Sequence, residues 1–277
     1  MSSVENDRVE LYVELLKKSL SYELWEEQGV PVERIGYGGP LLRSAVAGVG
    51  RVLGLAGLQL VRRPPEDAEA RREGKFWPSQ AHTMIGRPRL DNLHRAVETA
   101  LAESIPGDLM ETGVWRGGAC ILMRGILAAR GVRDRRVIVA DSFAGLPPPD
   151  PRYPADAGDD HYKLGLLAVS RADVEAAFRA YGLLDDQVVF LEGFFEDTIP
   201  TAPVEQLAVL RLDGDMYQST IECMTHLYPK LSPGGFCIVD DYGLEGCAKA
   251  VDDYRAEHGI ETPMERIDWT GVFWRKA

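Results

Sequence analysis

Acidic residues follow two apolar runs that have the length and composition of buried strands. Asp213 comes directly after residues 207–212, and Asp240 and Asp241 come directly after residues 236–239. Because the carboxyl ends of parallel strands meet at one edge of a sheet, these three carboxylates are expected to converge. Carboxylates in one place repel one another unless a cation neutralises them, and ligands that are all oxygen favour Mg²⁺. The pattern therefore predicts a magnesium site, although any single member could instead cap the helix that follows it.

Two more acids stand at the ends of earlier apolar runs and indicate a ligand beside the metal. Glu111 opens a loop, residues 111–118, whose glycines let the backbone approach a ligand closely. An acid there would repel a pyrophosphate but attract the ammonium group of a methionine. Asp141 ends the next run, where a carboxylate accepts hydrogen bonds from both ribose hydroxyls of an adenosine. Together they predict S-adenosylmethionine as the ligand, with Gly113, Arg116 and Gly117 of the loop among its contacts.

A metal and a sulfonium donor at one sheet edge indicate methyl transfer to an oxygen. A divalent ion lowers the pKa of a bound hydroxyl and orients its oxygen for in-line attack on the methyl group. Asp215, two residues beyond Asp213, would lie close enough to take the hydroxyl proton as general base. Two other roles stay open for Asp215: it could hydrogen-bond to a metal ligand, or it could help to cap the helix that follows. His161, in the loop 159–162, is a rival base or a substrate contact.

The elements that position these residues alternate along the chain. Strands are expected at residues 109–114, 137–140, 188–191, 207–212 and 236–239, and helices at residues 119–129, 174–181, 219–227 and 248–257. This alternation predicts an α/β fold with a parallel, doubly wound sheet. Residues 264–268 and 271–274 predict a closing antiparallel hairpin, which is compatible with a mixed sheet.

The polar, proline-containing segment 146–164 is long enough to be a lid over this sheet edge. It contains three aspartates besides the histidine discussed above. Asp156, Asp159 and Asp160 either recognise the substrate or keep the lid soluble.

The N-terminal part of the chain is expected to be a helical extension. Apolar residues recur with helical spacing between residues 9 and 20, and a charged connection rich in arginine and proline spans residues 62–77. We therefore expect an extension at residues 1–75 and a catalytic domain at residues 76–277. The apolar stretch 41–61 is interrupted by Arg43 and Arg51, so no membrane span is expected there. A buried helix, an oligomer contact and a mobile cover over the active site all stay open for it.

Composition excludes some partners. The chain has 277 residues, 45% of them hydrophobic, and a formal net charge of -12. A nucleic-acid partner is not expected, because phosphate binding requires clustered Lys and Arg. The four cysteines, at positions 120, 223, 237 and 247, lie in or beside apolar stretches, which indicates buried, reduced thiols. No secretory signal opens the chain, so a cytoplasmic location is expected.

Several motifs resemble the macrocin O-methyltransferase family, whose members methylate sugar hydroxyls in macrolide and related antibiotic pathways. The matching stretches are residues 81–86, 111–118, 140–147, 192–200, 212–220, 227–235 and 239–242. The resemblance covers residues 76 to 277 in order. It implies a Rossmann-like class I methyltransferase fold with a seven-stranded sheet, S-adenosylmethionine as donor, Mg²⁺ as cofactor and a homo-oligomer in which N-terminal segments close neighbouring sites.

The resemblance also implies roles for individual residues. The donor contacts would be Thr83, Met84, Glu111, Gly113, Asp141, Ser142, Ser170, Gly193 and Phe194. The metal ligands would be Asp213, Asp240 and Asp241, with Asp215 as the base. The chain departs from the family pattern at Gln218, where an acid is common, and at Phe194, where Trp is usual.

The sequence therefore predicts a Mg²⁺-dependent O-methyltransferase acting on a sugar hydroxyl of a glycosylated natural product of macrolide type. Nucleotide-linked sugars and catechol-like diols stay open as acceptors, since two adjacent hydroxyls would chelate Mg²⁺ in the same way. A nucleotide-binding oxidoreductase would not place an acid at Glu111. A non-catalytic scaffold would be expected to lack part of the aspartate trio.

Overall fold

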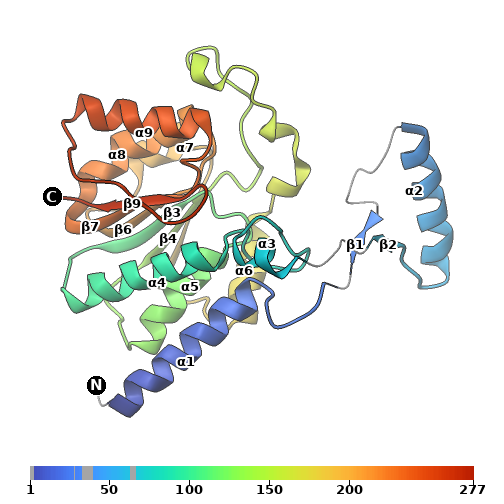
Figure 1. Ribbon diagram of the computed structural model, residues 1–277, viewed down its shortest axis with the longest axis horizontal. Coiled ribbons are helices and arrows are strands. Elements are labelled where there is room, and N and C mark those ends of the chain that lie inside the picture. The colour runs from blue at the N-terminus through green and yellow to red at the C-terminus, as the bar shows by residue number, and fades with distance from the viewer. Residues whose placement is uncertain (1–2, 28, 33–39, 63–66) are drawn as a thin grey trace.

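The computed structural model describes residues 3–27, 29–32, 40–62 and 67–277, and its centre is a seven-stranded sheet (Figure 1). The strand order is β5-β4-β3-β6-β7-β9-β8. The strands are β3 (Asp108–Thr112), β4 (Val137–Asp141), β5 (Val188–Glu192), β6 (Leu207–Leu212), β7 (Leu231–Val239), β8 (Glu265–Arg266) and β9 (Val272–Arg275). The first five are parallel, whereas β9 pairs antiparallel with both β7 and β8. The predicted mostly parallel sheet with a C-terminal antiparallel hairpin is confirmed.

Helices cover both faces of this sheet, as Figure 1 shows. One face is covered by α4 (Arg87–Ala102), α5 (Gly118–Ala129) and α6 (Arg171–Ala180), and α1 (Ser3–Leu20) packs on α5 and extends the same core. The other packs against α7 (Phe195–Thr198), α8 (Tyr217–Leu227) and α9 (Glu245–Glu257). Each face therefore has its own apolar core. Because the strands are buried on both sides, their sequences are uninterrupted apolar runs.

Two elements differ from the sequence-based expectation. Strand β7 begins at Leu231, five residues earlier than expected, because the Ser-Pro-Gly-Gly stretch lies inside the strand, where its pairing register with β6 shifts. Helix α4 was not predicted. It begins at Arg87 with Pro88 as its second residue, and its buried face includes the polar residues Arg89, Asn92 and His94. Its buried apolar residues also recur with helical spacing, a signal that the sequence analysis overlooked: Leu90, Leu93, Ala96, Val97 and Ala100.

The N-terminal region consists of two parts with different surroundings. Val9, Val13, Leu16 and Leu20 of α1 belong to the core beneath the sheet. Helix α2 (Pro40–Leu55), with the short pair β1 (Val30–Pro31) and β2 (Val61–Arg62), stands away from the sheet in Figure 1. None of the described side chains in 44–55 is buried. Of the three alternatives left open for residues 41–61, a buried helix does not fit the single chain.

A short helix, α3 (Ala68–Arg72), follows the charged connection. Residues 33–39 of the extension and 63–66 of the connection lie outside the described residues. Of the helices in the described ranges, not one is long and apolar enough to cross a membrane.

Candidate active site

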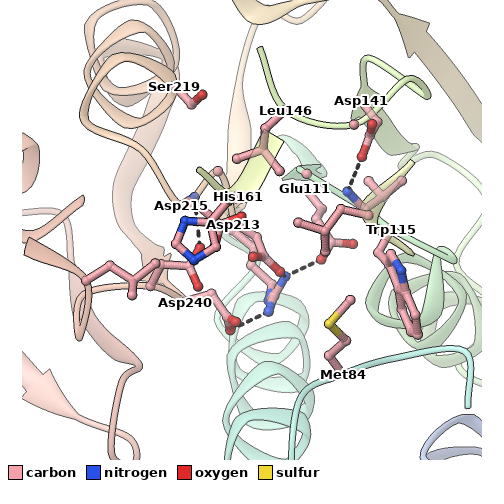
Figure 2. A pocket seen from close by; sticks show the side chains of 18 of the residues that line it. Met84, Glu111, Trp115, Asp141, Leu146, His161, Asp213, Asp215, Ser219 and Asp240 are labelled. Carbon is pink, nitrogen blue, oxygen red and sulfur yellow. Dashed lines mark hydrogen bonds and ion pairs between the residues drawn. The ribbon is translucent and has the colours of Figure 1, made fainter. Parts of the chain in front are cut away.

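A cavity of about 300 Å³ opens at the carboxyl edge of the sheet, beside the loops that follow β3, β4, β6 and β7. Figure 2 shows acidic side chains from several of these loops facing one space. Twelve of the residues expected from the sequence line it: Thr83, Met84, Glu111, Gly113, Asp141, Ser142, His161, Phe194, Asp213, Asp215, Asp240 and Asp241. The predicted donor, metal and base residues thus largely share one cavity.

The backbone around the cavity adopts conformations that ordinary residues avoid. Trp115, Phe143 and Asp215 have φ of 46, 53 and 58°, and they lie in the loops after β3, β4 and β6. Positive φ costs a non-glycine residue about 1–3 kcal/mol and persists only where the surrounding structure enforces it. The three loops that face the ligand space therefore carry local strain at the same sheet edge.

Three carboxylates meet at the ends of β6 and β7. Ligand oxygens of Asp213, Asp240 and Asp241 all lie within 4.8 Å of one another. Burial and the neighbouring carboxylates raise the pKa of Asp241 well above its usual range, and burial followed by Asp240 raises the pKa of Asp213. A cation relieves such repulsion, and a donor set of oxygen alone suits Mg²⁺, which typically takes about six oxygens including water. The residues present fit the predicted ion.

Two buried arginines neutralise part of this charge. Arg211, inside β6, pairs with Glu111, with Asp240 and, at 2.7 Å, with Asp213. Arg89, from α4, pairs with the other oxygen of Asp240. Figure 2 draws the pairs to Glu111 and Asp240 as dashed lines. Sequence reasoning missed both arginines. Arg211 could have been found, because an arginine in an otherwise apolar buried strand is tolerated only when it is paired.

Glu111 is already paired within the protein. Its side chain is 2% exposed; Oε1 accepts from Arg211 and Oε2 from the Cys120 thiol at 2.8 Å. Burial raises the pKa of Glu111 to about 7, against the opposing effect of Arg211. A donor ammonium group would therefore share this carboxylate with Arg211, which makes Glu111 a link between the donor side and the metal side of the cavity.

Asp141 is held by the backbone of two loops. Oδ2 accepts from the Val114 N–H at 2.7 Å and Oδ1 from the Phe143 N–H at 2.8 Å. Burial raises the pKa of Asp141, and these backbone hydrogen bonds act in the opposite direction. The Ser142 hydroxyl, 3.5 Å from Oδ1, and the Trp115 N–H also donate to this carboxylate, so its orientation at the edge of the cavity is fixed.

The two candidates for the proton acceptor, Asp215 and His161, both line the cavity. Burial, followed by Asp213, raises the pKa of Asp215 to about 7. His161 comes from the lid, where its Nδ1 lies 2.7 Å from Oδ2 of Asp159, and this hydrogen bond raises the pKa of the imidazole. With Nδ1 occupied by Asp159, Nε2 is the ring atom left to exchange a proton.

Four predicted donor contacts are absent from the cavity lining. Ser170 caps α6, accepting from the Asp173 N–H. Arg116 donates to the carbonyls of Ser79 and Ala81 at 2.8 Å. Gly117 precedes α5, and Gly193 precedes Phe194 after β5. These four residues lie in the loops around the site, where they contribute to loop conformation, and they do not line the cavity. All four cysteines are buried and free, as predicted.

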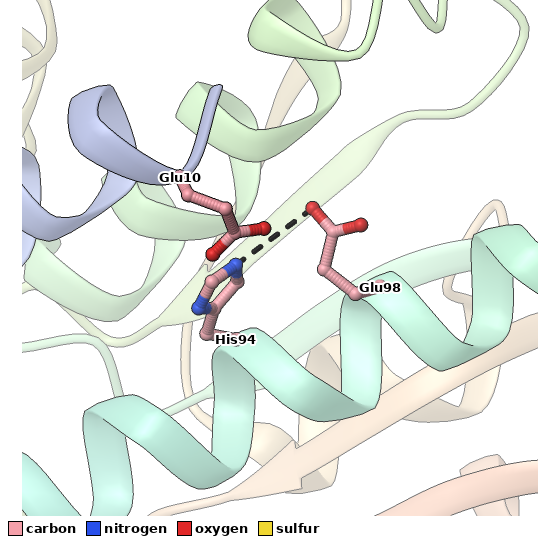
Figure 3. A group of neighbouring side chains, drawn as sticks. All are labelled: Glu10, His94 and Glu98. Carbon is pink, nitrogen blue, oxygen red and sulfur yellow. Dashed lines mark ion pairs between the residues drawn. The ribbon is translucent and has the colours of Figure 1, made fainter. Parts of the chain in front are cut away.

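A second group of possible metal ligands lies far from this edge. Glu10 of α1 and His94 and Glu98 of α4 also place ligand atoms within 4.8 Å of one another (Figure 3). Arg130 at the end of α5 already donates to Glu98 at 2.8 Å and to Glu10 at 3.1 Å. A guanidinium thus supplies the positive charge, and the group joins three helices instead of offering an open metal site.

The sheet order, the covering helices and the acid-lined cavity at the carboxyl edge define an S-adenosylmethionine-dependent methyltransferase of class I. The solved structure of the O-methyltransferase NovP matches with a TM-score of 0.79 and 43% identity, covering 97% of this chain and 99% of that chain.

Curated relatives match over almost the whole length. The chain is 47% identical over 273 residues, 97% of each protein, to mycinamicin III 3''-O-methyltransferase of Micromonospora griseorubida. It is 46% identical, over 97% of this chain and 94% of the relative, to 8-demethyl-8-(2,3-dimethoxy-alpha-L-rhamnosyl)-tetracenomycin-C 4'-O-methyltransferase of Streptomyces olivaceus. The macrocin O-methyltransferase family model matches residues 9–276, so the chain belongs to this family and is an O-methyltransferase.

Proposed function

We propose that this enzyme methylates a sugar hydroxyl of a glycosylated natural product, of the macrolide-type antibiotics or a related class, in a reaction that requires Mg²⁺. The convergence of Asp213, Asp240 and Asp241 beside the donor loops carries the metal part of the proposal. The names of the relatives support the acceptor part, since one specifies a rhamnosyl group on a tetracenomycin.

The reaction moves one methyl group and one proton. The acceptor oxygen forms a bond to the methyl carbon while the bond from that carbon to the donor sulfur breaks, and the sulfur keeps the electron pair. S-adenosylhomocysteine and the methyl ether are the products, and the hydroxyl proton passes to a base. When bound, Mg²⁺ supplies a Lewis acid that makes the hydroxyl more acidic. Glu111 and Asp141 orient the donor, and the aspartate trio holds the ion.

We assign the proton to Asp215, with His161 as the alternative. Asp215 lines the cavity two residues after Asp213 without being among the three ligands, so its carboxylate is free to accept a proton. His161 contacts the acceptor side from the lid, held by Asp159.

The rim of the cavity supports an acceptor with an apolar body. Trp77, Leu164, Leu166 and Trp269 line the cavity and are all at least 45% exposed. Large exposed apolar side chains around an acidic centre suit a sugar whose aglycone lies on the rim. This observation favours a glycosylated apolar compound over a nucleotide-linked sugar, whose phosphates would gain nothing from an apolar rim.

We propose in addition that the enzyme is a homo-oligomer and that residues 1–75 contribute its contacts. Val49, Val52 and Leu55 of α2 are 50%, 68% and 91% exposed. An apolar helix that stands away from its own sheet gains stability by packing against another chain. Light scattering after size exclusion tests this part of the proposal separately from the chemistry.

Calorimetric titration with S-adenosylhomocysteine, with and without Mg²⁺, tests the central proposal. We expect micromolar binding of the nucleoside and a separate Mg²⁺ event that Asp213→Asn abolishes. Methyl transfer to glycosylated macrolides, to their aglycones and to catechols then distinguishes the acceptor classes. Failure to bind S-adenosylhomocysteine under either condition contradicts the proposal.

A further inference from the structure

We propose that Asp156 is a positioning residue that locks the lid onto the amino end of α8 and thereby fixes His161 relative to the metal loop. The inference rests on the proposed function for its catalytic meaning. It concerns a carboxylate outside the cavity lining, one that we expected either to recognise substrate or to keep the lid soluble.

Asp156 is the one buried residue in the lid. From Ala144 to Ser170 every other side chain is exposed or half-buried, whereas Asp156 is 3% exposed. It ends a short 3₁₀ turn, Pro154–Asp156. Aspartate is almost never fully buried unless it has partners, so this carboxylate must be satisfied inside the protein.

Those partners are the first backbone N–H groups of α8. Oδ1 accepts from the Tyr217 N–H at 2.7 Å and Oδ2 from the Gln218 N–H at 2.9 Å. The residue at the helix cap itself, Met216, has no side-chain oxygen and makes no capping hydrogen bond. Asp156 therefore supplies from the lid the capping acceptor that α8 lacks locally, and its negative charge complements the helix dipole.

Helix α9 leaves room for this contact. A Cβ at Gly246 would lie 3.0 Å from Oδ1 of Asp156 and 3.2 Å from the Tyr217 nitrogen. Any larger residue at position 246 would press on the carboxylate. The lid, α8 and α9 thus meet at one buried point.

A continuous chain of hydrogen bonds leads from this point to His161. The Asp156 carbonyl accepts from the Asp159 N–H at 3.0 Å. The Asp159 carboxylate in turn accepts from the His161 N–H at 2.9 Å and lies 2.7 Å from the ring Nδ1. Because α8 starts two residues after Asp215, the same anchor sets the imidazole opposite the acidic loop.

The experiment compares Asp156→Ala with Asp160→Ala in the full-length enzyme. Asp160 is a matched control, since it removes the same charge from the same lid but its side chain is 74% exposed. We expect Asp156→Ala to lower kcat/KM for the acceptor by about tenfold, no more than the loss expected when His161 itself is replaced. The affinity for S-adenosylhomocysteine should stay within about twofold, and Asp160→Ala should behave as wild type.

Hydrogen exchange adds a readout that does not depend on turnover. Amides at 157–163 and 217–218 should exchange faster in Asp156→Ala and not in Asp160→Ala. Should the alanine variant fail to fold, the pair Asp156→Asn and Asp160→Asn decides, because asparagine keeps one acceptor oxygen and should restore part of the activity. An Asp156 variant that equals its Asp160 control in turnover and exchange overturns the inference. An inactive wild type that binds no S-adenosylhomocysteine overturns the proposed function instead.

Discussion

Gly113 and Asp213 touch through their backbones: a Cβ at Gly113 would overlap the carbonyl oxygen of Asp213. The first residue belongs to the loop after β3 and the second to the loop after β6. Gly113 also has φ +84°. This contact joins the donor loop to a proposed metal ligand, so the two halves of the site cannot move independently.

Gly113→Ala is therefore expected to lower both stability and donor affinity. A left-handed alanine costs about 1–2 kcal/mol, and the overlap with Asp213 adds to that cost. Gly131→Ala is the control, because Gly131 has φ +69° but no atom within 4 Å of its Cβ position. Urea unfolding and calorimetry with S-adenosylhomocysteine measure the two effects. Equal losses in the two variants would show that the contact is unimportant.

Asp213→Asn and Asp240→Asn should both remove metal-dependent turnover but differ in stability. Asp240 is 3% exposed and both its oxygens pair with arginines, so its replacement removes one buried counter-ion from Arg89 and one from Arg211, which keep Asp268 and Glu111 as partners. Breaking a buried pair costs about 3–5 kcal/mol. Asp213 is 28% exposed and pairs with Arg211 alone, so its replacement should cost less. Thermal unfolding and Mg²⁺ titration test this; unchanged turnover in Asp213→Asn would refute the metal assignment.

Asp141→Ala should weaken S-adenosylhomocysteine binding by about 1–3 kcal/mol, the cost of leaving polar groups without their charged acceptor. Ser170→Ala serves as the comparison, because this hydroxyl caps α6 and does not line the cavity. We expect the serine variant to keep its donor affinity. A loss in Ser170→Ala as large as that in Asp141→Ala would restore Ser170 as a donor contact.

Asp215→Asn and His161→Gln distinguish the two proton acceptors. If Asp215 takes the proton, Asp215→Asn should lower kcat by about 100-fold or more while Mg²⁺ still binds. His161→Gln should then cost no more than about tenfold. Rapid-quench kinetics at saturating acceptor measures kcat, and calorimetry measures the metal. The reverse order of effects assigns the proton to His161, and loss of Mg²⁺ in Asp215→Asn makes this residue a ligand.

The sequence predicted where the acids meet because strand ends follow from local patterns. Runs of apolar residues define the strands, and parallel strands end at one edge, so Asp213, Asp240 and Asp241 could be placed together without any knowledge of long-range contacts. The confirmed mostly parallel sheet and its closing hairpin rest on the same local signals.

What the sequence could not predict depends on pairs far apart in the chain. Arg211 meets Glu111, a hundred residues away, and Asp156 meets Tyr217 across the lid. Neither pairing produces a periodic pattern in the sequence. The polar part of the buried face of α4 depends on such a pairing too, since Arg89 meets Asp240. Long-range polar pairing, not propensity, decided these features.

The acidic centre also predicts how stability depends on pH. Burial raises the pKa of Asp215 from 3.8 and of Glu111 from 4.5 to about 7 in the folded chain. Between these values the folded state holds protons that the unfolded state has released, so metal-free stability should fall as pH rises from about 5 to about 7. The pKa of His161 is also raised in the folded chain, so its deprotonation likewise lowers the stability of the folded state as pH rises.

Mg²⁺ should oppose this loss, because it binds the deprotonated carboxylates of the folded state. Urea unfolding at several pH values, in a chelator and then in Mg²⁺, measures both curves. Asp215→Asn removes one buried ionisation and should flatten the metal-free curve, whereas Asp160→Asn, at an exposed lid position, should leave it unchanged. Metal-free stability that stays level or rises across this window would show that these carboxyl groups ionise freely, and the electrostatic case for a cation at this site would fail with it.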